Sequence, residues 1–294
     1  MEEWIVAASE TNEKLIAFLA AKLSSNMSRR SIKEQVEKGA CSVNGKREQF
    51  ASSRLAAGDK VHFSSRSVHV KRSVEFEMSR VIHEDDALII YNKPPGISCD
   101  KSGMIQLLHS KDSTLRLMHR LDKETTGLLI FVKSEETFQH LFAQFKAREI
   151  KKQYIALVHG CIKEGQGRLV NQYGKLCELE GQSIWGAVGT GGVEAITDWE
   201  KIASNRHYSL LYCYPQTGRT HQIRSHLASM GHPIVGDLQY RQSTYSRIPQ
   251  GVNRYLLHAA AIEFIHPATS QIASFFAPLP KDYQAVLRNE NLNY

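Results

Sequence analysis

The sequence predicts an α+β protein with a small first domain and a larger second one. The chain has 294 residues, and at roughly 150 residues per domain that length suggests about two domains. Its apolar, strand-like stretches do not alternate regularly with helices, as they would in a doubly wound parallel sheet. Its excess positive charge is confined to one N-terminal segment. These three observations indicate the α+β class and the division into two parts.

The composition excludes several classes of protein. Hydrophobic residues make up 42% and charged residues 23% of the chain, which is ordinary globular usage. No run reaches the roughly 20 apolar residues of a membrane helix, and the acidic N-terminus lacks the basic start of a signal peptide. The 5 cysteines form no CxxC pair, which favours free thiols and argues against zinc. We therefore expect a cytoplasmic protein with no membrane partner and no metal.

Positive charge is concentrated between residues 11 and 72. This segment has 13 Lys and Arg residues against 5 Asp and Glu, a net charge of +8, whereas the whole chain carries +7. Such a concentration favours a polyanionic partner, because neutralising phosphates releases condensed counterions. A solvated basic face without a partner is the alternative explanation.

Two helices are expected in the basic segment. Leucines four residues apart predict a helix over residues 11–23, and Ile32 and Val36 predict another over residues 28–38. Asn44-Gly45 is a tight-turn signal between short strands. The polar side of the second helix would carry three basic residues, Arg29, Arg30 and Lys33.

The rest of the chain is predicted to form mainly strands, with few helices. A polar linker is expected over residues 64–80, a helix should begin after Ser134, and Ile223 and Leu227 fit one face of another helix. The glycine-rich residues 186–192 match no phosphate loop, so we expect a flexible loop. Alternating or continuous apolar runs predict strands at residues 61–63, 88–91, 128–132, 151–158, 208–214 and 256–264.

Two polar clusters could carry chemistry. The first, residues 119–127, lies just before an apolar strand and would put Asp122 on a loop at the strand edge. A lone Asp in a loop is more often a turn or capping residue. The second, residues 216–226, places Arg219 at an expected helix start. His221 and His226 are five apart and do not share a helical face, which makes a metal pair a poor interpretation.

The first domain resembles the S-four-like RNA-binding domain, named after a small-subunit ribosomal protein. The stretch SRRSIKEQVEKGACSVNGK and the closing GDKV carry this resemblance. It implies a small α/β RNA-binding domain over residues 11–72. Its RNA contacts would include Arg29, Arg30, Lys33 and Lys46.

The second domain contains six sequence blocks in a fixed order: EDDALIIYNKPPG, HRLDKETTGLLIF, KKQYIALVHG, TGRTHQIRSH, GHPIVGDLQY and HAAAIEFIHP. In these blocks and their order the domain resembles RNA pseudouridine synthases of the RluA type. The resemblance implies a mixed, mainly antiparallel central sheet with flanking helices over residues 80–294. It also implies an isomerase that converts uridine in RNA to pseudouridine without a cofactor.

The same resemblance assigns roles to individual residues. The Asp of HRLD, which is Asp122, would be the essential catalytic residue, and Tyr154 and Arg219 would complete the catalytic set. The family pattern is poor over residues 160–192. RNA contacts in this domain would come from His119, Arg120 and Arg224.

Pseudouridylation suits a carboxylate, a guanidinium and a phenol. The reaction breaks the bond between uracil nitrogen 1 and the ribose and rejoins the base through carbon 5, with no redox change. The carboxylate of Asp122 could attack the sugar or the base, or assist a glycal intermediate, and the residues leave these routes open. A guanidinium close to it, expected from Arg219, would favour its ionised form. Tyr154 could stack on the detached uracil and move a proton.

Several substrates and functions remain open at this stage. The uridine must leave its stack to react, which favours single-stranded or looped RNA. Large-subunit ribosomal RNA is the expected substrate, because family members with an S-four-like domain commonly modify it, and transfer RNA is the alternative. A non-catalytic RNA-binding protein that retains the fold and a nucleoside hydrolase are the competing functions. We expect a monomer.

Overall fold

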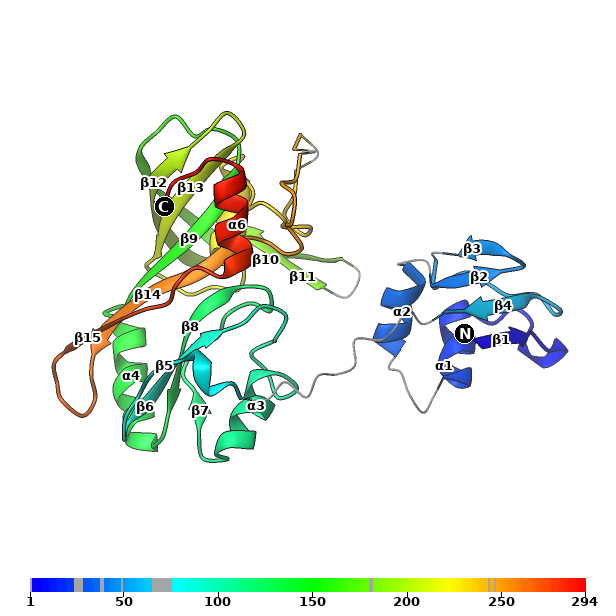
Figure 1. Ribbon diagram of the computed structural model, residues 1–294, viewed down its shortest axis with the longest axis horizontal. Coiled ribbons are helices and arrows are strands. Elements are labelled where there is room, and N and C mark those ends of the chain that lie inside the picture. Colours follow the sequence, from blue (N-terminus) through cyan, green and yellow to red (C-terminus); the bar gives the residue numbers. More distant parts are fainter. Residues whose placement is uncertain are drawn as a thin grey trace. The chain divides into compact units, whose positions relative to one another are not determined.

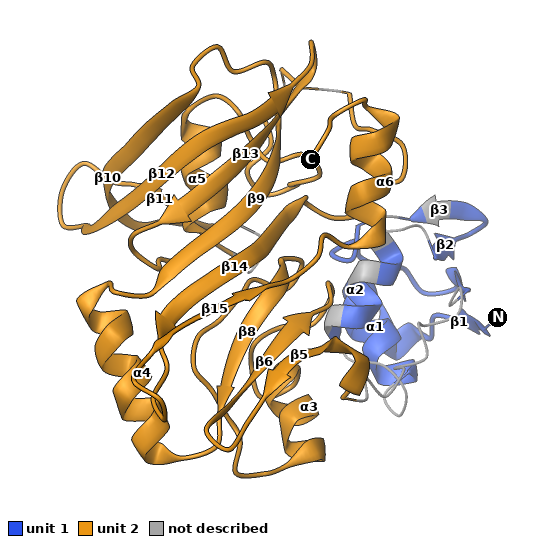
Figure 2. Cartoon of the chain, turned by 60° about the vertical axis from the view of Figure 1, so that its left-hand side comes forward, with its two compact units in different colours: residues 1–74 blue, residues 75–294 orange. Residues whose placement is uncertain are grey.

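The chain forms two compact units, residues 1–74 and 75–294, shown in different colours in Figure 2. The computed structural model describes residues 2–23, 29–37, 40–48, 50–64, 76–179, 182–242, 244–245 and 247–294. Most of the predicted linker, residues 65–75, lies outside the described residues. Within the described ranges, no helix has the length and apolar character needed to cross a membrane.

The first unit combines a small antiparallel sheet with two helices (Figure 1). Both predicted helices and the hairpin at Asn44-Gly45 are confirmed. The two turn residues have positive φ angles, 52° and 77°, as this kind of hairpin turn requires. The elements are β1 (Glu2–Ile5), η1 (Ala8–Glu10), α1 (Leu15–Lys22), α2 (Arg29–Glu37), β2 (Cys41–Val43), β3 (Lys46–Glu48) and β4 (Lys60–Phe63).

Strand β1 extends this unit beyond the predicted domain of residues 11–72. It pairs antiparallel with β4, so the sheet order is β1-β4-β2-β3. Strand β1 was not predicted because most of its residues are exposed and show no inward-facing alternation. The leucine stripe of α1 packs with α2 and β4 in one core: Leu15, Phe18, Leu19, Ile32, Val36, Val61 and Phe63.

The second unit is built on one long mixed sheet. Its strands are β5 (Val81–Glu84), β6 (Leu88–Lys93), β7 (Arg116–Leu117), β8 (Thr126–Val132), β9 (Lys151–His159), β10 (Gln166–Leu179), β11 (Gln182–Ala187), β12 (Val193–Ser204), β13 (Tyr208–Pro215), β14 (Leu257–Ile265) and β15 (Ile272–Phe276). The main path is β11-β10-β12-β13-β9-β14-β8-β6-β5, with β15 beside β14 and β7 beside β8. Among the described residues, β14 and β8 pair in parallel and every other neighbouring pair is antiparallel. The predicted α+β fold with a mainly antiparallel sheet is therefore confirmed.

Helices cover both faces of this sheet. On β6 and β8, α3 buries Met104 against Ile89 and Leu129, whereas α4 buries Leu141 on the opposite face. Burial on both faces explains why these strands read as continuous apolar runs instead of alternating patterns. The helices of this unit are η2 (Met78–Arg80), α3 (Met104–Lys111), α4 (Glu135–Ala147), α5 (Gln222–Ser229) and α6 (Lys281–Asn289).

The strands β9 and β13 are covered in the same way. Leu227 of α5 packs with Val158 and Leu211, and Val286 of α6 packs with Leu157 and other residues of the opposite face. This burial fixes α5, which carries a residue of the candidate site, against the sheet.

The structure confirms the predicted strands and the start of α4, where the Ser134 hydroxyl accepts a hydrogen bond from Thr137 N at 3.1 Å. It corrects the loop expected over residues 186–192, because Gly186 and Ala187 end β11. The long strands β10 and β12 were not predicted, since many of their side chains are polar and exposed and weaken any periodic pattern.

The buried histidine His258 should make the second unit sensitive to acid. Its Nε2 donates to Ala277 O at 3.1 Å and its Nδ1 lies 2.8 Å from the Thr126 hydroxyl. Burial lowers the pKa of His258 to about 4. Between pH 6.5 and 4 the unfolded chain therefore takes up a proton that the folded chain excludes, and stability falls as pH falls. At pH 5 this one group should cost about 2 kcal/mol.

Urea denaturation of the full chain at pH 7 and pH 5 measures this effect. His258→Gln should lose part of the difference between the two pH values. The matched control, His109→Gln, changes an exposed histidine on α3 and should keep the wild-type difference. An unchanged pH dependence in His258→Gln would contradict the prediction.

Candidate active site

Asp122 lies on the turn between β7 and β8, as predicted from the sequence. Its carbonyl oxygen accepts a hydrogen bond from Thr125 N at 3.1 Å, which closes the turn. The preceding residue, Leu121, is buried, and its backbone N–H donates to Cys99 Sγ at 3.4 Å. The core therefore holds both sides of the turn, while the Asp122 side chain keeps 26% of its surface exposed. The carboxylate is fixed at the edge of the core and accessible.

Arg224 of α5 is the guanidinium that contacts this carboxylate. Its Nη1 donates to Asp122 Oδ2 at 3.2 Å. Its Nε and Nη2 donate to the two oxygens of the buried Asp237 at 2.6 and 3.0 Å, and Nη2 also donates to Gln239 Oε1 at 2.9 Å. Such a two-pronged pair sets both the position and the plane of the guanidinium. Arg224 is 5% exposed, so it presents one rigid positive charge to Asp122.

Two aromatic rings complete the packing around Arg224. The Cζ atom of Arg224 lies 4.4 Å from the ring centre of Tyr255 and 5.0 Å from that of Tyr240, which is close enough for cation–π attraction. Burial alone would lower the pKa of Arg224, but its hydrogen bonds to Asp237 and the nearby negative charges raise it. The guanidinium therefore stays charged although it is out of water.

Two protonated phenols face the same group of residues. Burial raises the pKa of Tyr154 on β9, and the negative charge of Asp122 raises it further. The same two causes, in the same order, raise the pKa of Tyr255. Both hydroxyls therefore keep their protons at neutral pH and can donate hydrogen bonds. Tyr154 and Asp122, which the sequence resemblance grouped together, are close enough in the fold to influence each other.

His221 approaches Asp122 from the start of α5. Its Nε2 lies 3.9 Å from Asp122 Oδ1 and its Nδ1 lies 3.1 Å from the Tyr240 hydroxyl. Burial lowers the pKa of His221, and the charge of Asp122 offsets part of this effect. Its backbone has a φ of 56°, a left-handed conformation that costs energy in a non-glycine residue and is frequent at functional sites.

The structure corrects the predicted partner of Asp122. Arg219 is exposed, and its Nε donates to the backbone oxygen of Glu194 at 3.3 Å. It precedes α5 on a loop, whereas Arg224 lies inside the helix on the side that meets Asp122. The predicted salt bridge between Arg219 and Asp122 is therefore wrong, and Arg224 forms it instead.

Two residues predicted to contact RNA have partners within the protein: Arg224 is buried and His119 is partly buried. Arg224 donates hydrogen bonds to Asp237, Gln239 and Asp122, and its contact with RNA stays a prediction. The Nε2 atom of His119 accepts a hydrogen bond from Ile130 N at 3.3 Å, and its ring lies 5.5 Å from that of Phe145. Burial lowers the pKa of His119 to about 3, so the ring is a neutral packing element.

The other residues predicted to contact RNA differ in accessibility. Arg120 is exposed beside Asp122, and Arg29 and Lys46 are exposed on the first unit. Lys33 is partly buried. The side chain of Arg30 lies outside the described residues.

Several residues that hold Arg224 were not predicted from the sequence. Asp237, Gln239 and Tyr240 lie in the GHPIVGDLQY block, which was recognised as a unit without a role for each residue. Asp237 also accepts hydrogen bonds from the backbone of Gln239 and Tyr240 at 3.0 and 3.1 Å. Tyr255 belongs to no block, and only the fold brings it against Arg224.

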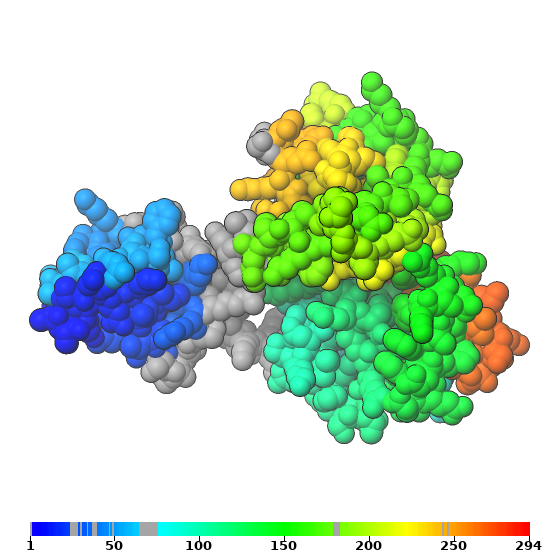
Figure 3. Space-filling view, turned by 180° about the vertical axis from the view of Figure 1, so that it is seen from behind, coloured from blue at the N-terminus to red at the C-terminus, as the bar shows by residue number. Residues whose placement is uncertain are grey.

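The site joins the two halves of the second unit. Asp122 comes from the half that contains β5–β8, whereas Arg224 and Asp237 follow β13. Figure 3 shows the cyan-to-green half and the light-green-to-yellow half meeting along a recessed boundary. The Asp122 side chain, 26% exposed, contacts Arg224 of the other half and keeps part of its surface accessible.

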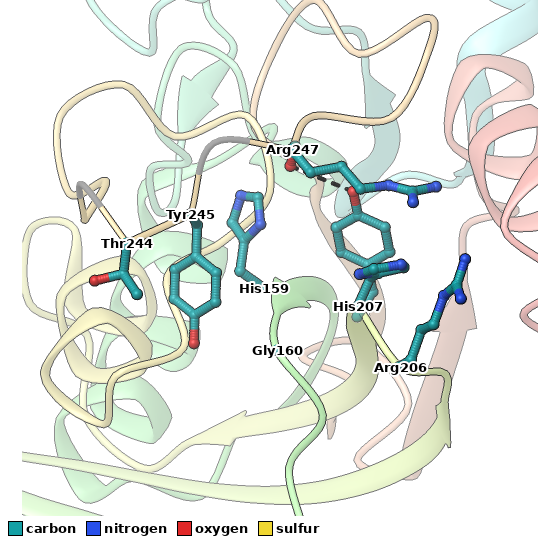
Figure 4. Close-up of a pocket in the computed structure, with 8 residues that line it drawn as sticks. His159, Gly160, Arg206, His207, Thr244, Tyr245 and Arg247 are labelled. Carbon is teal, nitrogen blue, oxygen red and sulfur yellow. Dashed lines mark hydrogen bonds between the residues drawn. The ribbon is translucent and has the colours of Figure 1, made fainter.

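A separate cavity of about 200 Å³ lies at the ends of β9 and β13. Figure 4 shows His159 and Tyr245 side by side, with ring centres 5.0 Å apart, and Arg206 and His207 on the facing turn. The Tyr208 hydroxyl donates to Arg247 O at 3.3 Å. None of the residues that line this cavity belongs to the Asp122 site.

Comparison with known proteins relates most of the chain to one enzyme family. Residues 87–229 match the family of RNA pseudouridylate synthases. Ribosomal large subunit pseudouridine synthase C of Vibrio vulnificus is 34% identical over 275 residues, which cover 86% of this chain and 85% of that protein. The protein of the same name from Escherichia coli O6:H1 is 29% identical over 309 residues, covering 96% and 94%.

A solved structure supports the fold. Human RNA pseudouridylate synthase domain containing 4 superposes with a TM-score of 0.61 at 22% identity, covering 74% of this chain and 94% of that one. The similarity to the Vibrio protein exceeds what unrelated chains show and extends through the segments that carry Asp122, Tyr154 and Arg224. The chain belongs to the RNA pseudouridine synthases, the isomerases that convert uridine in RNA to pseudouridine.

Proposed function

We propose that the protein forms pseudouridine in large-subunit ribosomal RNA and that Asp122 is its catalytic carboxylate. The observation that carries the role of Asp122 is its contact with Arg224, a guanidinium that Asp237 and two aromatic rings hold rigidly. A carboxylate that is accessible and paired with a fixed cation is suited to act as a nucleophile or to stabilise charge on the sugar. The substrate class is supported by the relatives named for the large ribosomal subunit.

The reaction is an isomerisation within one nucleotide and needs no second substrate. The bond between nitrogen 1 of uracil and carbon 1′ of ribose breaks, and the base turns so that a bond forms between its carbon 5 and carbon 1′. A proton then leaves carbon 5, and nitrogen 1 ends with a proton. Asp122 attacks or stabilises the reacting sugar or base, and the Tyr154 ring and hydroxyl hold the detached base and relay a proton. Arg224 keeps the carboxylate aimed and counters its charge.

Mapping pseudouridine across cellular RNA, with and without the protein, tests the substrate. Loss of one or more sites in large-subunit ribosomal RNA is the expected result, with recovery when the gene is restored. Loss confined to transfer RNA would support the alternative substrate. Release of free uracil from RNA by the purified protein would indicate a hydrolase instead.

The first unit is proposed to be an S-four-like domain that binds RNA mainly through phosphates. Support comes from its net positive charge and from the exposure of Arg29 and Lys46. Phosphate contacts fix the position of an RNA, whereas the catalytic unit selects the uridine. Its cysteines are free thiols, which suits a reducing compartment, and we propose that the protein acts in the cytoplasm. We also propose that it acts as a monomer.

Replacing Arg29 and Lys46 together by Glu should weaken RNA binding about tenfold or more and reduce the salt dependence of binding. Removing one phosphate interaction should lower the salt slope by about one. Turnover at saturating RNA should change little, because the two residues lie outside the catalytic unit. Filter binding at several salt concentrations and single-turnover rates measure the two effects.

The control for this prediction replaces Glu3, an exposed acidic residue of the same unit, with Gln. This control should not weaken binding. Removal of residues 1–74 should reproduce the loss of affinity on a larger scale. Unchanged affinity and an unchanged salt slope in both the double variant and the truncated protein would contradict the proposal.

A further inference from the structure

Three potential metal ligands converge at one edge of the second unit. His83 lies on β5, Asp85 lies in the turn that follows it, and His266 comes directly after β14. Asp85 Oδ2 lies 3.0 Å from His83 Nε2 and 2.9 Å from His266 Nε2. All three ligand atoms lie within 4.8 Å of one another. We infer that His83, Asp85 and His266 form a binding site for one zinc ion.

The buried nitrogen of His266 is the strongest sign of a ligand. The His266 side chain is 7% exposed, and among the described residues its Nε2 has no hydrogen-bond partner, although Asp85 Oδ2 lies 2.9 Å away. The contact between the two is close but not aligned for a hydrogen bond. A buried polar atom without a partner is rare in folded proteins and calls for an explanation. A zinc ion placed between the three groups would take the Nε2 lone pair.

Surrounding contacts hold the ligands in position. The other oxygen of Asp85, Oδ1, accepts hydrogen bonds from Ala87 N and Leu88 N at 2.8 and 2.9 Å, which leaves Oδ2 facing the histidines. Gln144 of α4 exchanges two hydrogen bonds of 2.8 Å with the backbone of Ile265, next to His266. Such supporting contacts fix the orientation of ligands and raise metal affinity.

Zinc binding would require a change of tautomer at His266 and the loss of one hydrogen bond. Its Nδ1 accepts a long hydrogen bond, 3.3 Å, from Ala268 N. Zinc at Nε2 requires the ring proton to sit on Nδ1, so this contact must be given up. Because the contact is long and therefore weak, and because zinc would coordinate the Nε2 that makes no hydrogen bond with the described residues, the exchange favours the ion.

The donor set favours zinc among the divalent metals. Imidazole nitrogen suits zinc and similar transition metals, whereas magnesium and calcium prefer oxygen ligands. Two histidines and one carboxylate leave a fourth position for water, and the partly exposed side chains of His83 and Asp85 give access to it. No residue is shared with the Asp122 site, so this ion would bind and stabilise without joining the uridine chemistry.

Sequence spacing did not indicate this site. His83 and Asp85 are two residues apart, which places both on one side of an extended segment, but His266 is far away in sequence. The hairpin of β14 and β15 packs over β6 and β8 in one core that includes Leu88, Ile130 and Phe264. This packing places His266 near the end of β5. Zinc would therefore link the edge strand β5 to the end of β14.

Zinc titration of the tag-free, full-length protein tests the inference. Calorimetry should show one high-affinity zinc ion per chain, and zinc should raise the thermal midpoint. His83→Ala and Asp85→Asn should each weaken zinc binding at least about tenfold and abolish the thermal shift. His109→Ala, which changes an exposed histidine on α3, should bind zinc as the wild type does.

A second measurement keeps the test decisive. His83 is partly exposed, so His83→Ala is expected to fold, and its melting without zinc should match that of the wild type. Cobalt in place of zinc should give an absorption spectrum without a thiolate charge-transfer band. The inference is overturned if the wild type binds no zinc, if His83→Ala keeps full affinity, or if the cobalt spectrum shows binding to the exposed Cys161 or Cys177.

Discussion

Replacing Asp122 with Asn should abolish pseudouridine formation while leaving the fold and RNA binding intact. Asn matches Asp in shape, and its amide oxygen can still accept the hydrogen bond from Arg224. It carries no negative charge and is a much weaker nucleophile, so the reacting sugar or base loses the group that would attack or stabilise it. The loss of a nucleophile costs roughly a thousandfold or more in turnover.

Release of the carbon-5 hydrogen from labelled RNA measures this turnover, because that hydrogen leaves in every productive cycle. Circular dichroism and an RNA-binding titration check the fold and affinity of the variant. The matched control is Glu124→Gln, which removes a carboxylate two residues away on the same turn and should stay active. Normal turnover in a folded Asp122→Asn protein would remove Asp122 from the mechanism.

Replacing Arg224 with Lys should reduce turnover about a hundredfold or more, whereas Arg219→Lys should leave the chemical step nearly unchanged. The single ammonium group of Lys cannot donate hydrogen bonds to both oxygens of Asp237 and to Asp122 at the same time. Asp237 is 1% exposed, and a buried carboxylate with unpaired oxygens is costly. Arg224→Lys should therefore also lower the thermal midpoint of the protein, as a melting curve would show.

Gln239→Ala provides a milder version of the same test. It removes one hydrogen bond to Arg224 and leaves the pairs with Asp237 and Asp122 in place. We expect a folded protein whose turnover falls about tenfold, with little change in RNA affinity, because the residue positions Arg224 and does not itself react. Single-turnover rates at saturating RNA separate these effects. Loss of chemistry in Arg219→Lys together with normal chemistry in Arg224→Lys would contradict the geometry.

Local patterns predicted the buried part of the fold well. Leucines four apart identified α1, Ser134 identified the start of α4, and continuous apolar runs identified β6 and β8. These signals are strong because each depends on neighbours in sequence. The strands β1, β10 and β12 were missed because they carry many exposed polar residues, and their pairing depends on partners elsewhere in the chain.

The candidate site was predicted only in part for a related reason. The position of Asp122 on a turn before β8 follows from residues beside it, and so does the grouping with Tyr154 through family blocks. The choice between Arg219 and Arg224 as the partner of Asp122 does not follow from neighbouring residues, since both arginines lie in one short cluster. Only the direction in which α5 leaves its first turn decides which guanidinium meets the carboxylate.

Periodicity, charge and short motifs were enough to predict the α+β class, the basic first unit, the enzyme family and the likeness that singles out Asp122, because they are properties of neighbouring residues. Other features appear only in the folded chain: Arg224 and not Arg219 contacts Asp122, Tyr255 packs on Arg224, and His266 meets Asp85. These contacts join segments that lie far apart in the chain. They exist because burying apolar surface on both faces of one sheet brings those segments together.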